Sequence, residues 1–239
     1  MKLIIAGATG LLGTEIVRQS LQIPDITQVI ALSCKPIQLD EGADSSKLKS
    51  VLIRDYGEYP DDVKAEFTGV DACIWTVSPI PLQTDRFGFS EVSRAWHDYT
   101  KIGFEAMYEA GPVHPFRFMY VRTEKFEDST WKPVMKVDYQ VMRRNTELTV
   151  LKFPTEKEGV EVCIAQPGVI VKSTIWSTGL MANICRIINI FGRPVPEIYP
   201  NELAAAVLNQ VMDGFEKETL LDSDLVRIGQ KALDISQDS

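Results

Sequence analysis

Three glycines near the start of the chain have the spacing of a phosphate-binding turn. They lie in Gly7–Gly13, which reads Gly-Ala-Thr-Gly-Leu-Leu-Gly. The apolar run Met1–Ala6 before it predicts a buried strand, and Glu15–Leu21 after it has apolar residues at helical spacing. A backbone without Cβ can turn sharply and approach a pyrophosphate, and the first amides of the following helix then face the anion.

Strand, glycines and helix in this order predict a dinucleotide site rather than a plain glycine-rich turn. We expect its contacts to come from Gly7, Thr9, Gly10, Leu11, Leu12 and Gly13.

The residues after the second predicted strand bear on which dinucleotide binds. A carboxylate there would bind a ribose 2′-hydroxyl, whereas a cation and a hydroxyl would bind a 2′-phosphate. Ser33 and Lys35 follow the predicted strand Gln28–Leu32, and the next acid is Asp40. This pattern favours NADP(H) over NAD(H), and the alternative is that Lys35 is a solvated loop lysine.

Two residues after the third predicted strand are candidates for the adenine end. Asp55 could accept a hydrogen bond from the adenine amino group, or it could form a turn, and the sequence leaves both open. Tyr56 lies next to it and is expected at the same end of the cofactor.

Apolar runs alternate with helical patterns along the whole chain. Strands are expected at Met1–Ala6, Gln28–Leu32, Val51–Ile53, Ala72–Val77, Phe116–Val121, Val160–Ile164 and Leu225–Ile228, and helices at Glu15–Leu21, Glu91–Glu109, Pro133–Leu151 and Glu202–Gly214. This alternation predicts an α/β protein with a doubly wound, mainly parallel sheet of the Rossmann type. We expect one domain over residues 1–239, with a small C-terminal substrate-binding part that includes a lid at about 170–200.

Composition excludes several functional classes. The net charge of −8 and the pI of about 4.9 argue against a nucleic-acid partner. No apolar segment is long enough for a membrane span or a secretory signal, so we expect a cytoplasmic protein. The four cysteines have no metal-binding spacing and the two histidines lie outside any ligand pattern, so no metal site is expected.

These features resemble the atypical short-chain dehydrogenase/reductase superfamily, including its NmrA-like and HIV-Tat-interacting-protein-like members. The resemblance covers nearly the whole chain. It rests on the glycine motif, Val70–Ala72, Arg117–Val121, Gln166–Ile170 and Asn201–Ala204. It implies an NAD(P)-binding Rossmann fold.

The resemblance also implies where a reaction would occur. Family members carry Tyr-x-x-x-Lys on the helix after the fifth strand, where the lysine charge lowers the pKa of the phenol so that its oxygen can exchange protons with a carbonyl or alcohol. The matching residues are Tyr139 and Arg143, with Glu147 one turn further on. Arginine keeps the charge but has a bulkier planar head. Thr123 would supply the hydroxyl expected after the fifth strand, and Arg122 precedes it.

Segments after the fourth and sixth strands are expected beside the reacting end. The candidates are Thr76, Pro167 and Val169 for the cofactor, and Ser78, Trp176 and Met181 for the substrate. Ile170–Phe191 could form an apolar lid over a hydrophobic small molecule. It could equally be a core-packing helix or the interface of a homodimer.

Three functions fit this pattern. The first is an NADP(H)-dependent reductase or isomerase acting on a small apolar carbonyl compound, with Tyr139 as proton donor. The second is a non-redox cyclase, dehydratase or isomerase of a specialised pathway, in which Arg122, Arg143 and Tyr139 polarise a substrate oxygen. The third is an NADP-sensing regulatory protein, with intact nucleotide glycines and an altered reaction centre. The alternative for the motif itself is that Tyr139 is an ordinary helix residue and Arg143 a surface cation.

Overall fold

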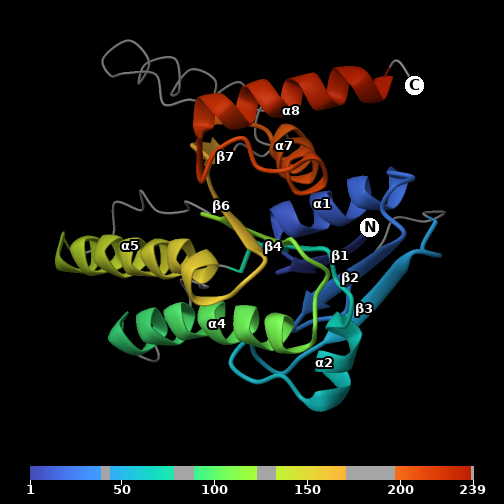
Figure 1. Cartoon of the computed structure of the whole chain (residues 1–239). Helices are drawn as coiled ribbons and strands as arrows, with labels where there is room; N and C mark the ends of the chain where they lie inside the picture. The colour runs from blue at the N-terminus through green and yellow to red at the C-terminus, as the bar shows by residue number, and fades with distance from the viewer. Residues whose placement is uncertain (39–43, 78–88, 123–132, 171–196, 238–239) are drawn as a thin grey trace, which may run out of the picture.

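A parallel sheet forms the centre of the molecule (Figure 1). The computed structural model describes residues 1–38, 44–77, 89–122, 133–170 and 197–237. The sheet has the strand order β3-β2-β1-β4-β5-β6-β9, and every neighbouring pair in it is parallel. Its strands are β1 (Lys2–Ala6), β2 (Gln28–Ser33), β3 (Leu48–Leu52), β4 (Ala72–Trp75), β5 (Phe116–Val121), β6 (Val160–Gln166) and β9 (Thr219–Leu221).

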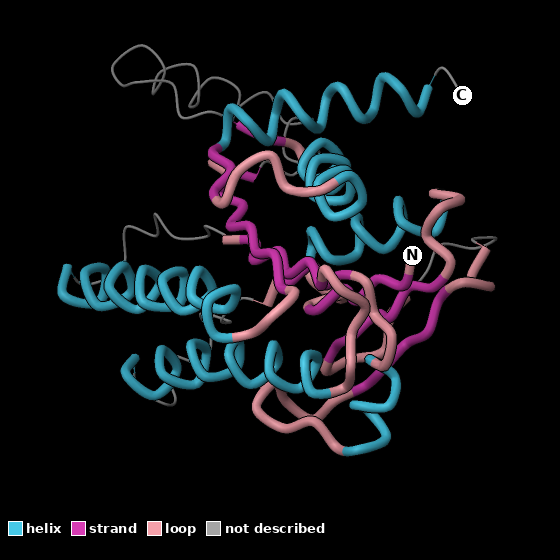
Figure 2. Tube along the Cα trace, viewed as in Figure 1, coloured by secondary structure: helices cyan, strands magenta, loops and turns pink. Residues whose placement is uncertain are grey.

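Helices cover both faces of this sheet, and the tube in Figure 2 shows the strands between the two helical layers. One layer contains α1 (Leu11–Gln22) and α7 (Pro200–Asp213), with α8 (Asp222–Gln237) packed on α7. The other contains α2 (Asp61–Phe67), α4 (Phe89–Glu109) and α5 (Pro133–Glu156). A second, two-stranded parallel sheet pairs β7 (Val169–Ile170) with β8 (Glu197–Ile198). The doubly wound, parallel α/β prediction is confirmed.

Burial on both faces explains why the strands read as continuous apolar runs. Along β1, Leu3 and Ile5 point to the α1/α7 layer, whereas Ile4 and Ala6 point to the α4/α5 layer. All four are fully buried. The alternation of side chains along the strand therefore anchors two separate apolar cores.

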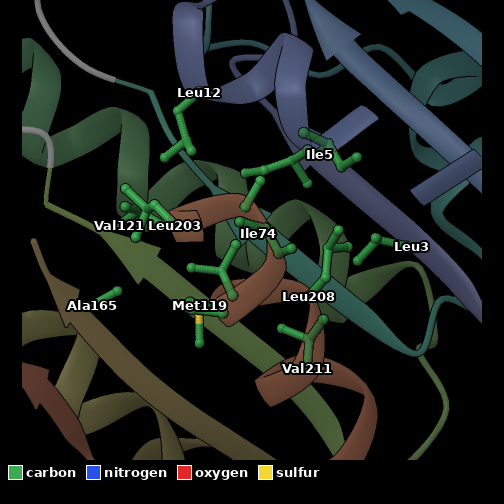
Figure 3. Close-up of a cluster of buried hydrophobic side chains, with 14 of the residues drawn as sticks. Leu3, Ile5, Leu12, Ile74, Met119, Val121, Ala165, Leu203, Leu208 and Val211 are labelled. Carbon is green, nitrogen blue, oxygen red and sulfur yellow. The ribbon is translucent and has the colours of Figure 1, made fainter. Parts of the chain in front are cut away.

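The core under α1 and α7 fixes the position of the first helix (Figure 3). Ile5 of β1 lies there near Ile74 of β4, and Leu12 of α1 and Leu203 of α7 belong to the same cluster. Truncating a buried leucine or isoleucine to alanine typically costs about 2–5 kcal/mol. This packing therefore holds the start of α1 firmly against the carboxyl end of β1.

Aromatic rings dominate the opposite core. Phe104 of α4 stacks on Phe153 of α5 with ring centroids 3.7 Å apart and an interplanar angle of 6°. Phe153 is buried, and α5 extends to Glu156, beyond the predicted end of that helix at Leu151. This contact holds α4 and α5 side by side under the sheet.

One predicted strand is wrong. Leu225–Ile228 belongs to α8, and the strand at this edge is β9, which pairs with β6. Leu225 and Ile228 are three residues apart and both buried, which is the spacing of one helix face. The helix begins directly after β9, where Asp224 accepts a hydrogen bond from the Leu221 N–H at 3.1 Å.

Within the described residues, no helix combines the length and the apolar character that a membrane crossing requires.

Candidate functional site

The strand order reverses between β1 and β4. The chain moves outward from β1 to β2 and β3, then returns to the other side of β1 to form β4. At such a reversal the two loops leave in opposite directions, and the opening between them is where ligands bind in open α/β sheets. Here the loops are the glycine turn after β1 and Thr76–Val77 after β4.

Two of the three glycines are required by the fold itself. Gly7 has φ +84°, and a Cβ there would lie 2.5 Å from Oγ1 of Thr76. A Cβ on Gly13 would collide with the carbonyl oxygen of Gly7. Gly13 therefore lets α1 pack directly on the turn, and Gly7 lets the turn pass beside β4.

The fold does not require a glycine at position 10 in the same way. Its φ of −75° and ψ of 165° are accessible to any residue, and Gly10 is exposed to solvent. The nearest atom to a Cβ there is the carbonyl oxygen of Gly7 at 3.2 Å. The fold would accept a side chain at this position with a small adjustment, so the absence of one is explained best by a ligand that approaches the backbone closely.

The start of α1 presents unpaired amides beside Gly10. The first helical hydrogen bond runs from the Thr14 N–H to the Gly10 carbonyl at 2.9 Å, so the amides of residues 11–13 have no partner within the helix. No acid lies in the first turn of α1, and no side chain caps it. Leu12 is buried and can offer only its backbone, whereas Thr9 and Leu11 are exposed. These groups fit a pyrophosphate, because the helix dipole and the amides both favour an anion.

Tyr56 and Thr76 support the glycine turn from the protein side. The Tyr56 hydroxyl accepts a hydrogen bond from the Gly7 N–H at 3.0 Å and donates one to the Leu32 carbonyl at 3.2 Å. Burial raises the pKa of Tyr56 well above its ordinary value, so the phenol keeps its proton. The Thr76 hydroxyl donates to the Ala6 carbonyl at 2.8 Å. Their direct contact with a cofactor stays a prediction.

The end of β2 shows which groups can reach a 2′-phosphate. Ser33 is fully buried, and its hydroxyl donates to the Lys35 carbonyl at 2.7 Å. Ser33 therefore shapes the turn, while the Lys35 side chain is exposed and accessible. Nearby, Asp55 Oδ1 accepts the Gly57 N–H at 2.7 Å. This hydrogen bond forms a turn, and a contact between Asp55 and the adenine amino group stays a prediction.

Charged and polar groups from three elements meet at the carboxyl ends of β5 and β6. Arg122, directly after β5, places Nη1 3.7 Å from Glu147 Oε1 on α5. Gln166 at the end of β6 donates from Nε2 to Glu147 Oε2 at 3.4 Å. The side chains of Arg122 and Glu147 are only 18% and 15% exposed. From the sequence, Glu147 and Gln166 are noted only as part of the family resemblance. The contacts of Glu147 with Arg122 and with Gln166 depend on the packing of α5 against β5 and β6.

Arg143 lies half-buried on α5, one turn before Glu147. Pro167 is buried at the end of β6, and the backbone of Val169 begins β7. The remaining candidates lie outside the described part of the structure: Ser78, Thr123, Trp176, Met181 and the side chain of Tyr139. Their assembly into a reaction centre stays a prediction, as does the lid at 170–200.

Among the described residues, no group of histidine, cysteine and carboxylate side chains could hold a metal ion.

Comparisons with known proteins agree with this geometry at the level of the fold. No known family profile matches the chain. Leucinostatins biosynthesis cluster protein T of Purpureocillium lilacinum is 30% identical over 132 residues, which cover 54% of this chain and 45% of that protein. The match thus spans less than half of the relative's length.

Several solved structures superpose on almost the whole chain. The dTDP-glucose 4,6-dehydratase DesIV of Streptomyces venezuelae, in a structure with NAD bound, has a TM-score of 0.64 and 16% identity, covering 99% of this chain and 81% of that one. Vestitone reductase of alfalfa (Medicago sativa) has a TM-score of 0.62 and 18% identity, covering 92% and 76%. This chain has the short-chain dehydrogenase/reductase fold. The PhqB reductase domain of Penicillium fellutanum shares the fold, with a TM-score of 0.62 and 14% identity over 93% and 67%.

Proposed function

We propose that this chain binds NADP(H) across the carboxyl edge of its sheet and reduces or isomerises a small apolar carbonyl compound. The observation that carries the proposal is Gly10. The fold does not strictly require a glycine at this position. Gly10 also lies beside the backbone amides of residues 11–13, which have no hydrogen-bond partner within α1. A pyrophosphate at that place accounts for both features.

The exposed Lys35, after β2, would hold the 2′-phosphate on the adenosine half of the cofactor. Arg122 and Arg143, at the β5 side of the sheet, would hold the other half. Two of the structural neighbours are named as reductases, and the structure of the third, a dehydratase, contains NAD. These names support a nicotinamide cofactor.

The family resemblance implies the roles of the chain's own residues. When bound, the cofactor would supply a hydride for the substrate's carbonyl carbon. Tyr139 donates the proton that the carbonyl oxygen needs, and Thr123 orients that oxygen. Arg143 lies one helical turn beyond Tyr139 on α5, where its charge favours the phenolate left after proton transfer.

A second function is favoured by the group around Glu147. Arg122 brings a largely buried positive charge to the end of β5, where charge developing on a substrate oxygen could be stabilised without hydride transfer. This would suit a cyclase, dehydratase or isomerase. The relative from a leucinostatins biosynthesis cluster supports a specialised pathway for either function.

Calorimetric titration of three proteins tests the cofactor proposal. We expect the wild type to bind NADPH more tightly than NADH. Gly10→Ala should lower the melting temperature only slightly, because its Cβ meets only the Gly7 carbonyl oxygen, at 3.2 Å, yet it should lose about tenfold or more in NADPH affinity. Gly13→Ala is the matched control: it should destabilise the fold, because its Cβ has no space.

Binding of neither nucleotide by the wild type would refute the proposal. Unchanged affinity in a well-folded Gly10→Ala protein would show that no phosphate approaches this turn.

Turnover then separates the candidate functions. Consumption of NADPH that depends on an added apolar ketone or enal would identify a reductase. Conversion without net NADPH consumption identifies the non-redox catalyst, and tight NADPH binding without conversion of any of these compounds favours the sensor.

A further inference from the structure

The turn that follows β6 is held by a residue from a distant part of the chain. Asp222 Oδ1 accepts a hydrogen bond from the Gly168 N–H at 2.7 Å, across 54 positions of sequence. A carboxylate acceptor makes this a charge-assisted bond, roughly twice as strong as a neutral one. Among the described residues no hydrogen-bond donor reaches the second oxygen, Oδ2, which is also buried. Within the described structure, the Gly168 N–H is therefore the donor that this carboxylate accepts from outside its own helix.

The sheet explains why Asp222 can reach this turn. β9 runs parallel to β6 with Leu221 opposite Gln166, so both strands end at the same edge. α8 starts at Asp222 without an intervening loop. The first residue of α8 therefore lies beside the point where the chain leaves β6, and the helix dipole favours its negative charge there.

The turn itself joins two parts of the site. Behind it lies Gln166, which donates to Glu147 at the reacting edge. Ahead of it lies β7, where Val169 is opposite Glu197 and Ile170 is opposite Ile198. The direction in which the chain leaves the main sheet at Gly168 determines how the backbone of residues 167–169 faces the carboxyl edge of the sheet.

We propose that Asp222 is a positioning residue for the nicotinamide half of the cofactor. This inference rests on the proposed NADP(H) site. A dinucleotide whose pyrophosphate lies at β1 extends its second half across β4 and β5 toward β6. By fixing the Gly168 amide, Asp222 orients the backbone that this second half meets, and it touches neither cofactor nor substrate itself.

Two ligands of different length test this assignment. NADPH contains both halves of the cofactor, whereas adenosine 2′,5′-bisphosphate contains only the half over β2 and β3. We expect Asp222→Ala to weaken NADPH binding about tenfold in calorimetry and to change binding of the bisphosphate by less than about twofold. Asp222→Asn should restore most of the NADPH affinity, because its amide oxygen can still accept the Gly168 N–H.

Asp224→Ala is the matched control. Asp224 lies in the same first helical turn and accepts the Leu221 N–H, and it pairs with Lys217 on the surface, at 2.7 Å. Its loss should leave both affinities unchanged.

The outcomes separate this inference from the proposed function. Wild-type protein that binds neither ligand contradicts the proposed function. Wild-type protein that binds both, with Asp222→Ala binding both equally well, contradicts only the role of Asp222. Equal weakening of both ligands in Asp222→Ala, with a lower melting temperature, would make Asp222 a purely structural residue and would also overturn the inference.

Discussion

At the glycine turn after β1, side chains are absent for different physical reasons. Thr76 leaves no space at Gly7, and the backbone of the turn leaves none at Gly13. At Gly10, which is exposed, a Cβ would meet only the Gly7 carbonyl oxygen, at 3.2 Å. Equal spacing in the sequence therefore includes two residues that the fold strictly requires and one that it requires less strictly.

In the proposed site, Lys35 is the residue on which a preference for NADP(H) would depend. Because the Ser33 hydroxyl is already bonded within the turn, the charge of Lys35 is the interaction left for a 2′-phosphate. We expect Lys35→Ala to weaken NADPH binding about three- to tenfold, the smaller value applying at high salt, and to leave NADH binding unchanged. Lys101→Ala, which removes an exposed charge on α4, is the control for net charge. A parallel loss of NADH affinity would show that Lys35 does not read the 2′-phosphate.

At the scale of elements, Glu147 links α5 to the ends of β5 and β6. It faces Arg122 from one strand and accepts a hydrogen bond from Gln166 of the next. Because these contacts join α5 to two adjacent strand ends, they fix which face of the helix packs against the sheet. Arg143, one turn away on α5, is positioned by the same packing.

The ion pair between Arg122 and Glu147 should contribute measurably to stability. Its groups are largely withdrawn from solvent, so removing the carboxylate leaves a poorly solvated guanidinium. We expect Glu147→Gln to lower the free energy of unfolding by about 1–2 kcal/mol. A double-mutant cycle with Arg122→Met should give a coupling energy of about 0.5–1.5 kcal/mol in urea denaturation.

The pair Lys101–Glu105 provides the comparison. Its atoms are 3.8 Å apart, close to the 3.7 Å of Arg122–Glu147, but its side chains are 51% and 42% exposed. Its coupling energy should be near zero. Equal coupling in the two cycles would mean that burial does not strengthen the inner pair.

At the scale of the whole molecule, the sheet separates two cores of different chemistry. The α1/α7 side is mainly aliphatic, whereas the α4/α5 side contains Phe104, Phe153 and three buried tyrosines, Tyr56, Tyr59 and Tyr120. Burial raises the pKa of Tyr56 and of Tyr59 above the ordinary value of 10.0. Unfolding exposes them to water, so the stability of the fold depends on pH.

We expect the free energy of unfolding to fall as pH rises above about 10. Tyrosines in the unfolded chain lose their protons there, while the buried ones keep theirs, so the unfolded state binds fewer protons and gains stability. Each tyrosine contributes a slope of at most about 1.4 kcal/mol per pH unit. Urea denaturation between about pH 8 and about pH 11 measures this fall.

Two conservative variants separate the tyrosines. Among the described residues, no group makes a hydrogen bond with the buried Tyr59 hydroxyl, so Tyr59→Phe should cost little at pH 8 and reduce the alkaline slope. Tyr56→Phe should reduce the slope similarly but cost about 1 kcal/mol at pH 8, because Gly7 and Leu32 lose a partner. An unchanged slope in both variants would assign the alkaline loss to other groups.

The parallel α/β fold and the glycine turn can both be predicted from the sequence, because both depend on local signals. Buried runs such as Leu3–Ala6 and a short strand–glycine–helix order are readable without knowing what packs against them. The pairing of the short strand Thr219–Leu221 with β6 was missed, because pairing partners lie far apart in sequence.

Which side chains are available to a ligand depends on the tertiary structure. The Ser33 hydroxyl is buried and bonded to the Lys35 carbonyl, a geometry that appears only once the chain is folded. Asp222 reaches Gly168 across 54 positions, and no local pattern in the sequence records a contact between residues so far apart.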